Sequence, residues 1–314
     1  MIVDLLASED QQMIADSLNG FLSDRLPLAR LREASAFGGG AERAQWRGLT
    51  ELGLFGVGLP EALGGLGLGL VEEALMARSL GAHLVSPAVL AQLVAPHLAG
   101  DADVRAALIS GECRAAFASV GGHVIDGVDA DQLVVLTGDG AVLAARSEVS
   151  TGELVDGLDE TLTLARVTAA PASGVSDARA SLLIAAYLTG IAQAATEMAV
   201  EYAKTRQQFG QAIGAFQAIK HMCADMATRA AAADAQVFYA AVTFEAVNDP
   251  VGDIAAARML AADAALANGK ANIQIHGGMG FTAECDAHLL LKRAQLMARL
   301  GATSARLRGQ VLAG

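Results

Sequence analysis

The sequence is poor in several features that mark particular classes of protein. Its only three cysteines, Cys113, Cys223 and Cys285, lie far apart and match no metal-ligand spacing, so we expect neither a disulfide framework nor a metal site. No uncharged apolar run approaches the roughly 20 residues that span a bilayer. The first 20 residues also lack a basic, apolar leader. These absences predict a cytoplasmic protein with reduced thiols and no membrane association.

Positive charge is also scarce. The 314 residues contain 22 Lys and Arg against 34 Asp and Glu, which gives a formal charge of −12. Because such a chain repels phosphate backbones, nucleic acid is not an expected partner, and an anionic ligand must be held by local donors. Aromatic residues make up only 4%, whereas Ala and Leu abound, which favours packed helices.

The order of the patterns predicts three regions. Long stretches with helical periodicity fill the start and the end of the chain, and short apolar runs between Gly-containing turns indicate strands in the middle. We therefore expect an α+β protein that is mostly α: an N-terminal helical domain over 1–112, a reduced β domain over 113–172 and a C-terminal helical bundle over 173–314. The expected strands are residues 114–118, 132–136, 141–145 and 160–164. The expected longer helices include 41–54, 70–80, 177–206, 214–247 and 251–275.

Two motifs in the C-terminal region could bind a ligand. The first is Thr205 to Gln217, in which Arg206 ends a long helix and Gly210 turns the chain. A guanidinium at such a corner can hold a phosphate through two parallel hydrogen bonds, and Gln208 and Phe209 add an amide and an aromatic face. On this pattern alone, Arg206 could equally be a cationic helix cap.

The second motif is Gln274 to Thr282, with three glycines in four residues after a helix. Backbone without Cβ atoms, as at Gly277 and Gly278, can approach a ligand closely and present its N–H groups. His276 lies within this segment and could contact the same ligand. A glycine C-cap with a polar residue at the helix end is the alternative.

Together with the loop Pro60 to Gly67, these motifs resemble the acyl-CoA dehydrogenase family over nearly the whole chain. The family patterns are P-E-x-x-G-G-x-G, R-x-x-F-G…F-Q and Q-x-x-G-G-x-G-(F/Y)-T, and all three occur here in the family's order. The resemblance implies the family's fold, FAD as cofactor, and oxidation of acyl-CoA thioesters to trans-2-enoyl-CoAs. It also implies that the second and third motifs reach the ADP half of an FAD bound mainly by a neighbouring subunit. The residues so implied are Arg206, Gln208, Phe209, Gln274, His276, Gly277 and Gly278.

The positions that should carry the family's catalytic base hold no carboxylate. Counted from Lys292-Arg293-Ala294, which matches the family's R-D-A region, the base position is Gly301. The alternative position, counted back from Arg206, is Ala180. Two neighbours that hold substrate in the family fall on Ala178 and Ser181, so we expect no catalytic residue in this chain.

The middle region has also lost polar groups that contact the flavin ring in the family, because residues 116–122 read Ala-Phe-Ala-Ser-Val-Gly-Gly. This selective loss resembles the short, non-catalytic subunits of α2β2 acyl-CoA dehydrogenases, including those of steroid side-chain degradation. It implies a full-length partner that supplies the catalytic Glu and most of the acyl-CoA site. Two alternatives stay open: a self-sufficient homo-oligomer with a displaced base, and a flavin-free structural subunit. The candidates for a displaced base are Glu197, Glu284 and Asp286.

Overall fold

The N-terminal part of the protein is a set of helices. The computed structural model describes residues 7–119, 121–137, 140–171, 178–244 and 250–313. The helices of this part are α1 (Glu9–Arg25), α2 (Gly40–Ala44), α3 (Trp46–Glu51), α4 (Leu70–Ala82), α5 (Pro87–Leu98) and α6 (Ala102–Ser110). The prediction of a single helix over 41–54 is wrong. The α-helix breaks at Gln45, and its second part ends before Gly53, whose backbone is left-handed.

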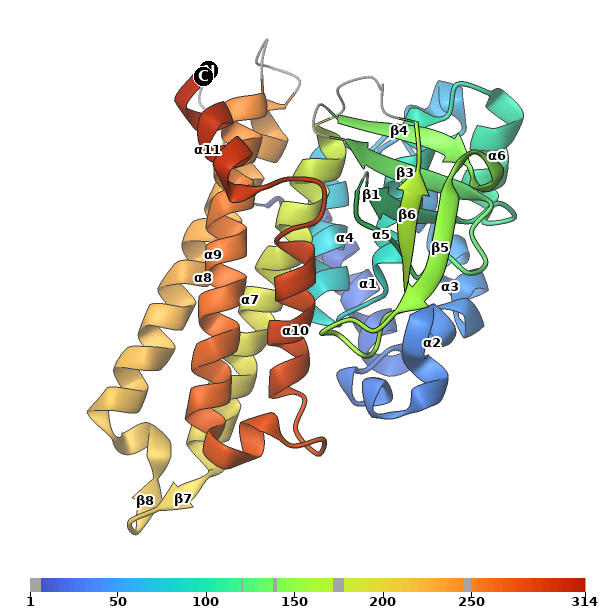
Figure 1. Ribbon diagram of the computed structural model, residues 1–314. Helices are drawn as coiled ribbons and strands as arrows, with labels where there is room; N and C mark the ends of the chain where they lie inside the picture. The colour runs from blue at the N-terminus through green and yellow to red at the C-terminus, as the bar shows by residue number, and fades with distance from the viewer. Residues whose placement is uncertain (1–6, 120, 138–139, 172–177, 245–249, 314) are drawn as a thin grey trace.

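The middle of the chain forms a six-stranded sheet. Its strands are β1 (Ala115–Ser119), β2 (His123–Ile125), β3 (Gln132–Thr137), β4 (Gly140–Ala145), β5 (Ser150–Val155) and β6 (Leu164–Ala169). They lie in the order β4-β3-β1-β2-β6-β5, and the β1–β3 pair is parallel while the others are antiparallel. Figure 1 shows the sheet beside the upper end of the C-terminal helices.

The strand expected over 160–164 is displaced, because β6 begins only at Leu164. Asp159 accepts hydrogen bonds from the backbone N–H and the hydroxyl of Thr161, which holds the preceding residues in a turn. Strands β2 and β5 were not expected. The first has three residues and the second is mostly exposed, so neither shows a long alternating pattern.

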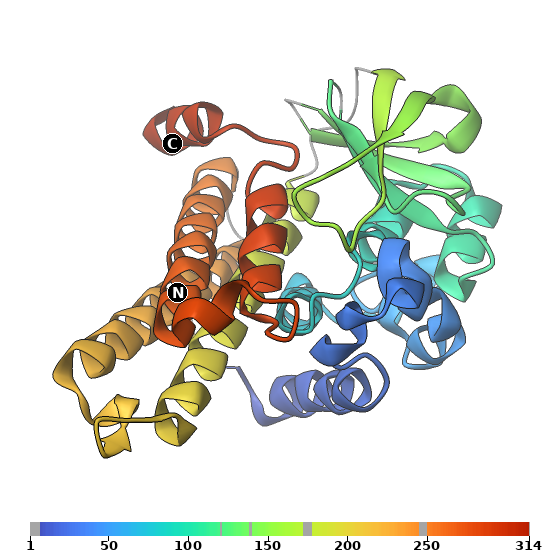
Figure 2. The same ribbon diagram turned by 60° about the horizontal axis from the view of Figure 1, so that its bottom comes forward.

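The C-terminal part is a helical bundle. Its helices are α7 (Arg179–Thr205), α8 (Gln217–Thr243), α9 (Val251–His276), α10 (Ala287–Met297) and α11 (Ser304–Ala313). A short hairpin of β7 (Gln207–Gln208) and β8 (Gln211–Ala212) joins α7 to α8. This hairpin and α11 lie at opposite ends of the bundle in Figure 1 and Figure 2. The structure therefore confirms a mostly helical α+β fold with a small middle sheet.

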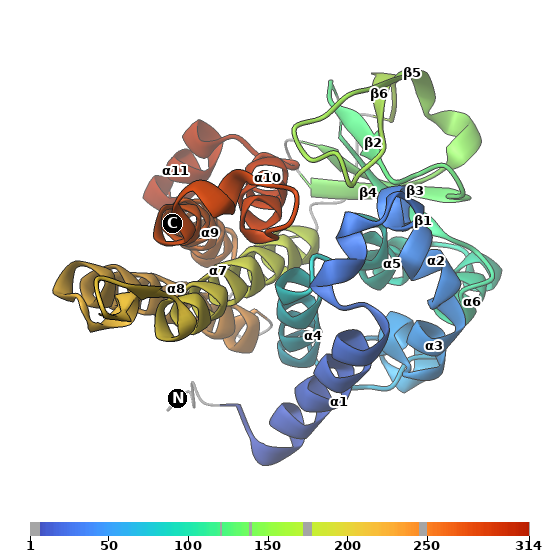
Figure 3. The same cartoon turned by 90° about the horizontal axis from the view of Figure 1, so that it is seen from below.

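Helix α7 is the centre of the molecule. Seen from below, it lies between α4 and α8 (Figure 3). Two glycines allow α4 and α7 to cross closely: a Cβ at Gly81 would lie 1.9 Å from the carbonyl oxygen of Tyr187, and one at Gly190 would lie 1.9 Å from that of Arg78. By length and composition, α7 could span a membrane, but 72% of its most apolar window is buried inside the protein. Its apolar residues therefore serve the core.

A buried arginine ties the three regions together. The guanidinium of Arg293 on α10 pairs with the carboxylate of Asp159 at 2.6 Å and donates to the hydroxyl of Thr161 at 3.0 Å. It also donates to the carbonyl oxygen of Leu84 at 3.0 Å and to the hydroxyl of Tyr187 at 2.8 Å. Because all three of its nitrogens are bonded, this charge is compensated inside the core. The network holds α10, and thus the chain that follows it, in a defined place.

Candidate functional site

Arg206 lies at an exposed corner of the bundle. As the C-cap of α7, it leaves the helix with extended backbone, and its N–H donates to the carbonyl of Tyr202 at 2.8 Å. Within the residues that the structure describes, its guanidinium has no hydrogen bond or ion pair. An exposed cation held by rigid backbone and free of internal partners is suited to bind an external anion.

The hairpin after Arg206 presents an aromatic ring to solvent. Its turn residues, Phe209 and Gly210, have left-handed backbone, with φ values of 51° and 79°. This conformation is unfavourable for a bulky residue such as phenylalanine. The ring of Phe209 is nevertheless 91% exposed, and it meets the ring of Phe216 edge-on at 6.1 Å between centroids. Gln208 is exposed on the adjacent strand, so the hairpin displays polar and aromatic groups together.

The glycine segment forms a second exposed surface at the end of α9. Gln274 is exposed on the last turn, and Gly277 ends the helix with a φ of 62°. A Cβ at Gly277 or Gly278 would have no atom within 4 Å, so the backbone there is open on one side. The segment can therefore present bare backbone N–H groups to a ligand.

A ring contact brings these two surfaces together. The imidazole of His276 stacks on the ring of Tyr202 near the end of α7, with centroids 4.1 Å apart. Its Nδ1 lies 2.8 Å from the carbonyl oxygen of Asn272, and the residue is buried. Of the seven residues selected from the sequence, six are thus exposed at one end of the bundle, whereas His276 packs beneath them.

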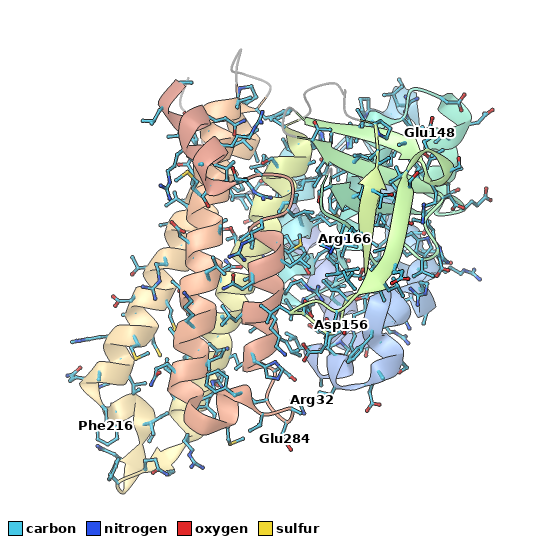
Figure 4. All side chains as sticks on the ribbon, in the orientation of Figure 1. Arg32, Glu148, Asp156, Arg166, Phe216 and Glu284 are labelled. Atoms are coloured by element: carbon cyan, nitrogen blue, oxygen red, sulfur yellow. The ribbon has the colours of Figure 1, made fainter. Side chains whose placement is uncertain are left out.

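The same end of the bundle carries exposed apolar side chains. Besides Phe209, the ring of Phe281 is 74% exposed and Met279 is 47% exposed. Large apolar groups exposed close to one another mark interaction surfaces more often than ordinary surface. Figure 4 labels Phe216 beside the hairpin at this end.

The positions counted for the family's base lie at the other end of the bundle. Gly301 and Ala180, together with Ala178 and Ser181, line one cavity of about 180 Å³. Two independent counts along the sequence thus converge on one place in the structure. Among the described residues, no Asp or Glu lines this cavity.

The sheet closes against this cavity at Gly301. The residue has a φ of 75°, and a Cβ placed on it would lie 3.0 Å from Cδ1 and 3.1 Å from Cβ of Leu136 on β3. A larger side chain at this position would therefore need an unfavourable backbone and a small movement of the Leu136 side chain. Glycine suits both the left-handed backbone and the close approach of Leu136.

The β1 segment offers no polar group to a flavin ring over most of its length. Ala116, Phe117 and Ala118 are completely buried in the sheet. Ser119 and His123 line a second cavity of about 340 Å³ between the sheet and α10. Residue 120 of the counted segment lies outside the described residues.

The three candidate displaced bases lie far from Gly301 and Ala180. Glu197 is exposed on α7, more than four turns from Ala180, so the two are about 25 Å apart along the helix. Glu284 and Asp286 precede α10, whereas Gly301 follows it, and 11 helical residues span about 16 Å. Figure 4 shows Glu284 beside Arg32 at the lower end of this helix.

The carboxylates of Glu284 and Asp286 have partners close to them in the structure. Asp286 forms two hydrogen bonds to the Arg32 guanidinium, at 2.8 and 3.0 Å. Hydrogen bonds from its own backbone N–H and from the hydroxyl of Thr282 lower the pKa of Glu284. Asp286 is thus held in an ion pair with Arg32, and neither carboxylate lines the cavity at Gly301.

Two side chains at the cavity were missed in the sequence. Arg258 lies on the buried face of α9, in line with Ile254, Ala261 and Ala265. A charged residue within an apolar stripe of a helix could have indicated this position in the sequence. Nothing in the sequence distinguishes Leu136, because an apolar residue in a strand is ordinary.

Among the described residues, no cluster of His, Cys, Asp and Glu is placed to hold a metal ion, and the three cysteines are free thiols.

Comparisons with known proteins agree with this architecture. Family models match twice: residues 8–110 match the acyl-CoA dehydrogenase N-terminal domain, and residues 175–314 match the acyl-CoA dehydrogenase C-terminal domain. Acyl-CoA dehydrogenase IpdE2 of Mycobacterium tuberculosis is 35% identical over 305 residues, covering 93% of each chain.

Solved structures show the same fold at lower identity. A chain of the ChsE4-ChsE5 complex from Mycobacterium tuberculosis has a TM-score of 0.80 at 21% identity and covers 99% of both chains. A chain of the steroid acyl-CoA dehydrogenase Tcur3481-Tcur3483, G363A variant, has a TM-score of 0.83 at 21% identity and covers 97% of both.

Proposed function

The chain belongs to the acyl-CoA dehydrogenase family, and from that membership we propose that it is the non-catalytic subunit of a heteromeric, FAD-dependent acyl-CoA dehydrogenase. Its Arg206 hairpin and glycine segment would complete the FAD site of a full-length partner, and the partner would supply the catalytic Glu. When bound, the FAD supplies the acceptor for the hydride that leaves the β-carbon of the acyl thioester.

The observation that carries this proposal is the contrast between the two ends of the bundle. At one end, the exposed cluster fits the nucleotide half of FAD: Arg206 offers a fork of donors to phosphate, Gln208 and Gln274 offer amides, and Gly277 and Gly278 offer open backbone. At the other end, the two counted base positions are Gly301 and Ala180, and no Asp or Glu among the described residues lines the cavity that they share.

The length of α7 separates these two ends. The helix has 27 residues and is therefore about 40 Å long. One dinucleotide cannot reach from the exposed cluster to the cavity at Gly301. The cluster therefore serves an FAD whose ring lies in another subunit, and the exposed rings of Phe209 and Phe281 support a partner surface there.

In this arrangement the chain's own residues bind and orient, and they move no proton. Arg206 would fix the pyrophosphate, the open glycine backbone would approach the adenosine side, and the ring of Phe209 would cover the nucleotide. The partner in the proposed α2β2 complex would hold most of the acyl-CoA. A structural neighbour described as a steroid acyl-CoA dehydrogenase favours a bulky, steroid-derived acyl group. A location in the cytoplasm stays part of the proposal.

Replacement of Arg206 in the assembled complex tests this role. A charge-assisted hydrogen bond is worth about 1.5–3 kcal/mol, so Arg206→Ala should weaken FAD retention roughly ten- to a hundred-fold. Arg206→Lys should recover only part of it, because an ammonium cannot reproduce the planar fork. Arg47→Ala is the matched control, since Arg47 is similarly exposed but lies on α3.

The measurement is the flavin absorbance per complex during dialysis against FAD-free buffer. Equal flavin loss from the wild-type, Arg206→Ala and Arg47→Ala complexes would show that Arg206 is only a helix cap. Loss in Arg206→Ala with an intact complex by size-exclusion chromatography would support the proposal.

A further inference from the structure

The side of α9 that packs against α7 carries a row of polar residues. Asn268, Asn272 and His276 are spaced by four residues, so they lie one turn apart on one side of the helix. Both asparagines are completely buried, and His276 is 8% exposed. Helices α7 and α9 run beside each other through the bundle (Figure 1). Because burying a polar side chain is costly unless it is hydrogen-bonded, the bonds of this row show what it holds in place.

Asn268 anchors the row to both neighbouring helices. Its amide nitrogen lies 3.2 Å from the carbonyl oxygen of Ala192 on α7 and 2.9 Å from that of Met226 on α8. Its amide oxygen accepts a hydrogen bond from Nε of Arg229 at 3.0 Å. These bonds fix the rotation and the axial position of α9 within the bundle.

His276, at the end of the row, is held by three contacts. A carbonyl oxygen can only accept, so the 2.8 Å contact with the carbonyl oxygen of Asn272 places a proton on Nδ1 of His276. The imidazole stacks on the ring of Tyr202, with 4.1 Å between centroids and 22° between planes. The glycine segment also packs against this residue, because a Cβ at Gly280 would lie 3.2 Å from Cβ of His276. His276 therefore contacts both the end of α7 and the glycine segment.

Tyr202 connects the same stack to Arg206. The two residues are one turn apart, and the carbonyl oxygen of Tyr202 accepts a hydrogen bond from the backbone N–H of Arg206 at 2.8 Å. The stacked rings thus join the last turn of α7, which leads into Arg206, to the last turn of α9, which leads into Gly277.

We propose that Tyr202 and His276 are positioning residues of the FAD site. Their stacked rings hold Arg206 and the glycine segment at a fixed separation, so that the two motifs bind one nucleotide together. This inference rests on the proposed FAD role of the exposed cluster. A site whose parts are already in place loses less conformational freedom when its ligand binds. Without the stack, the ligand itself would have to order the ends of α7 and α9, and its affinity would fall.

The FAD affinity of the complex assembled with a full-length partner tests the proposal. Tyr202→Leu keeps an apolar side chain but removes the ring, which should weaken FAD binding roughly two- to ten-fold, since that is what an aromatic pair contributes. Tyr202→Phe keeps the ring and should restore most of the affinity. His276→Leu removes the stack from the α9 side and should match Tyr202→Leu, so the test stands even if one of the two variants fails to fold.

Tyr239→Leu is the matched control. Tyr239 is a half-buried tyrosine like Tyr202, but it lies toward the far end of α8, about 33 Å from Gln217 at the hairpin. Its replacement should leave the FAD affinity unchanged. Urea unfolding of each lone chain gives the free energy of unfolding, so a general loss of stability can be separated from a loss at the FAD site.

A double-mutant cycle distinguishes positioning from simple packing. Flavin absorbance per complex after dialysis against graded FAD concentrations gives a dissociation constant for each variant. If the stack acts through Arg206, Tyr202→Leu should weaken FAD binding much less in the Arg206→Ala background than in the wild-type background. Equal losses in the two backgrounds would show that Tyr202 only packs, and would overturn the proposal.

Two other results would also contradict the positioning role. One is wild-type FAD affinity in both Tyr202→Leu and His276→Leu while Arg206→Ala is weakened, which would leave the proposed function standing. The other is an equal loss of affinity in Tyr239→Leu, because any packing defect in the bundle would then suffice. Unchanged FAD affinity in Arg206→Ala would instead overturn the proposed function, and this inference with it.

Discussion

Replacing Gly301 by alanine probes the closure of the counted base position. The left-handed backbone at this residue costs a non-glycine side chain about 1–2 kcal/mol. The new Cβ would also press against Leu136 at 3.0–3.1 Å, and overpacking of this kind costs about 1–3 kcal/mol. Gly301→Ala should therefore destabilise the protein by about 2–5 kcal/mol.

Gly210→Ala is the matched control for the backbone contribution. Gly210 has a similar φ of 79°, but a Cβ there would have no atom within 4 Å. Its replacement should cost only the backbone strain, about 1–2 kcal/mol. The difference between the two variants measures the steric contact with Leu136.

The assay is urea unfolding of each variant, followed by circular dichroism and extrapolated to water. Adding Leu136→Ala to the wild-type and to the Gly301→Ala chain completes a double-mutant cycle. The coupling free energy of the cycle should equal most of the steric cost of Gly301→Ala. If Gly301→Ala and Gly210→Ala cost the same, the sheet does not close the base position. Dehydrogenase activity gained by Gly301→Glu in the lone chain would refute the reasoning more strongly.

Two further predictions concern buried charges. Burial lowers the pKa of His83, with a smaller contribution from Arg30, so the unfolded chain binds the proton more readily. Stability should therefore fall as the pH drops through about 6.5, and His83→Asn should flatten this slope in urea unfolding at pH 5 to 8. Arg293→Met should cost about 3–5 kcal/mol, because the carboxylate of Asp159 stays buried and unpaired. Most of that loss should return in the Arg293→Met, Asp159→Leu double variant, and a costless single variant would contradict the network.

The helical parts of the fold were predictable from the sequence because their signal is long. The stretches expected at 177–206 and 251–275 match α7 and α9 to within a few residues, since many apolar positions repeat at helical spacing. The stretch over 214–247 begins later as α8, because the short β7–β8 hairpin and the turn that follows it take up the first residues. The strand expected over 160–164 was displaced by side-chain hydrogen bonds of Asp159, which no periodicity reveals.

The two ends of the bundle differ in how many of their functional residues could be predicted from the sequence. The motifs around Arg206 and Gly277 lie in short segments, so their residues could be named before the structure brought them together. The closure of Leu136 on Gly301 depends on two segments more than 160 residues apart, and pairwise packing of that kind leaves no trace in one sequence. The burial of Arg258 without an ion pair among the described residues could be seen only from its neighbours in space.

The flavin content of the chain, purified alone and together with a full-length family member that carries the catalytic Glu, tests the central claim most directly. The chain alone should be colourless or bind FAD only weakly, because Ala116, Phe117 and Ala118 of its β1 segment offer no polar side chain to a flavin ring. The co-purified complex should be yellow and active on an acyl-CoA. A stoichiometric flavin spectrum from the lone chain would contradict the account.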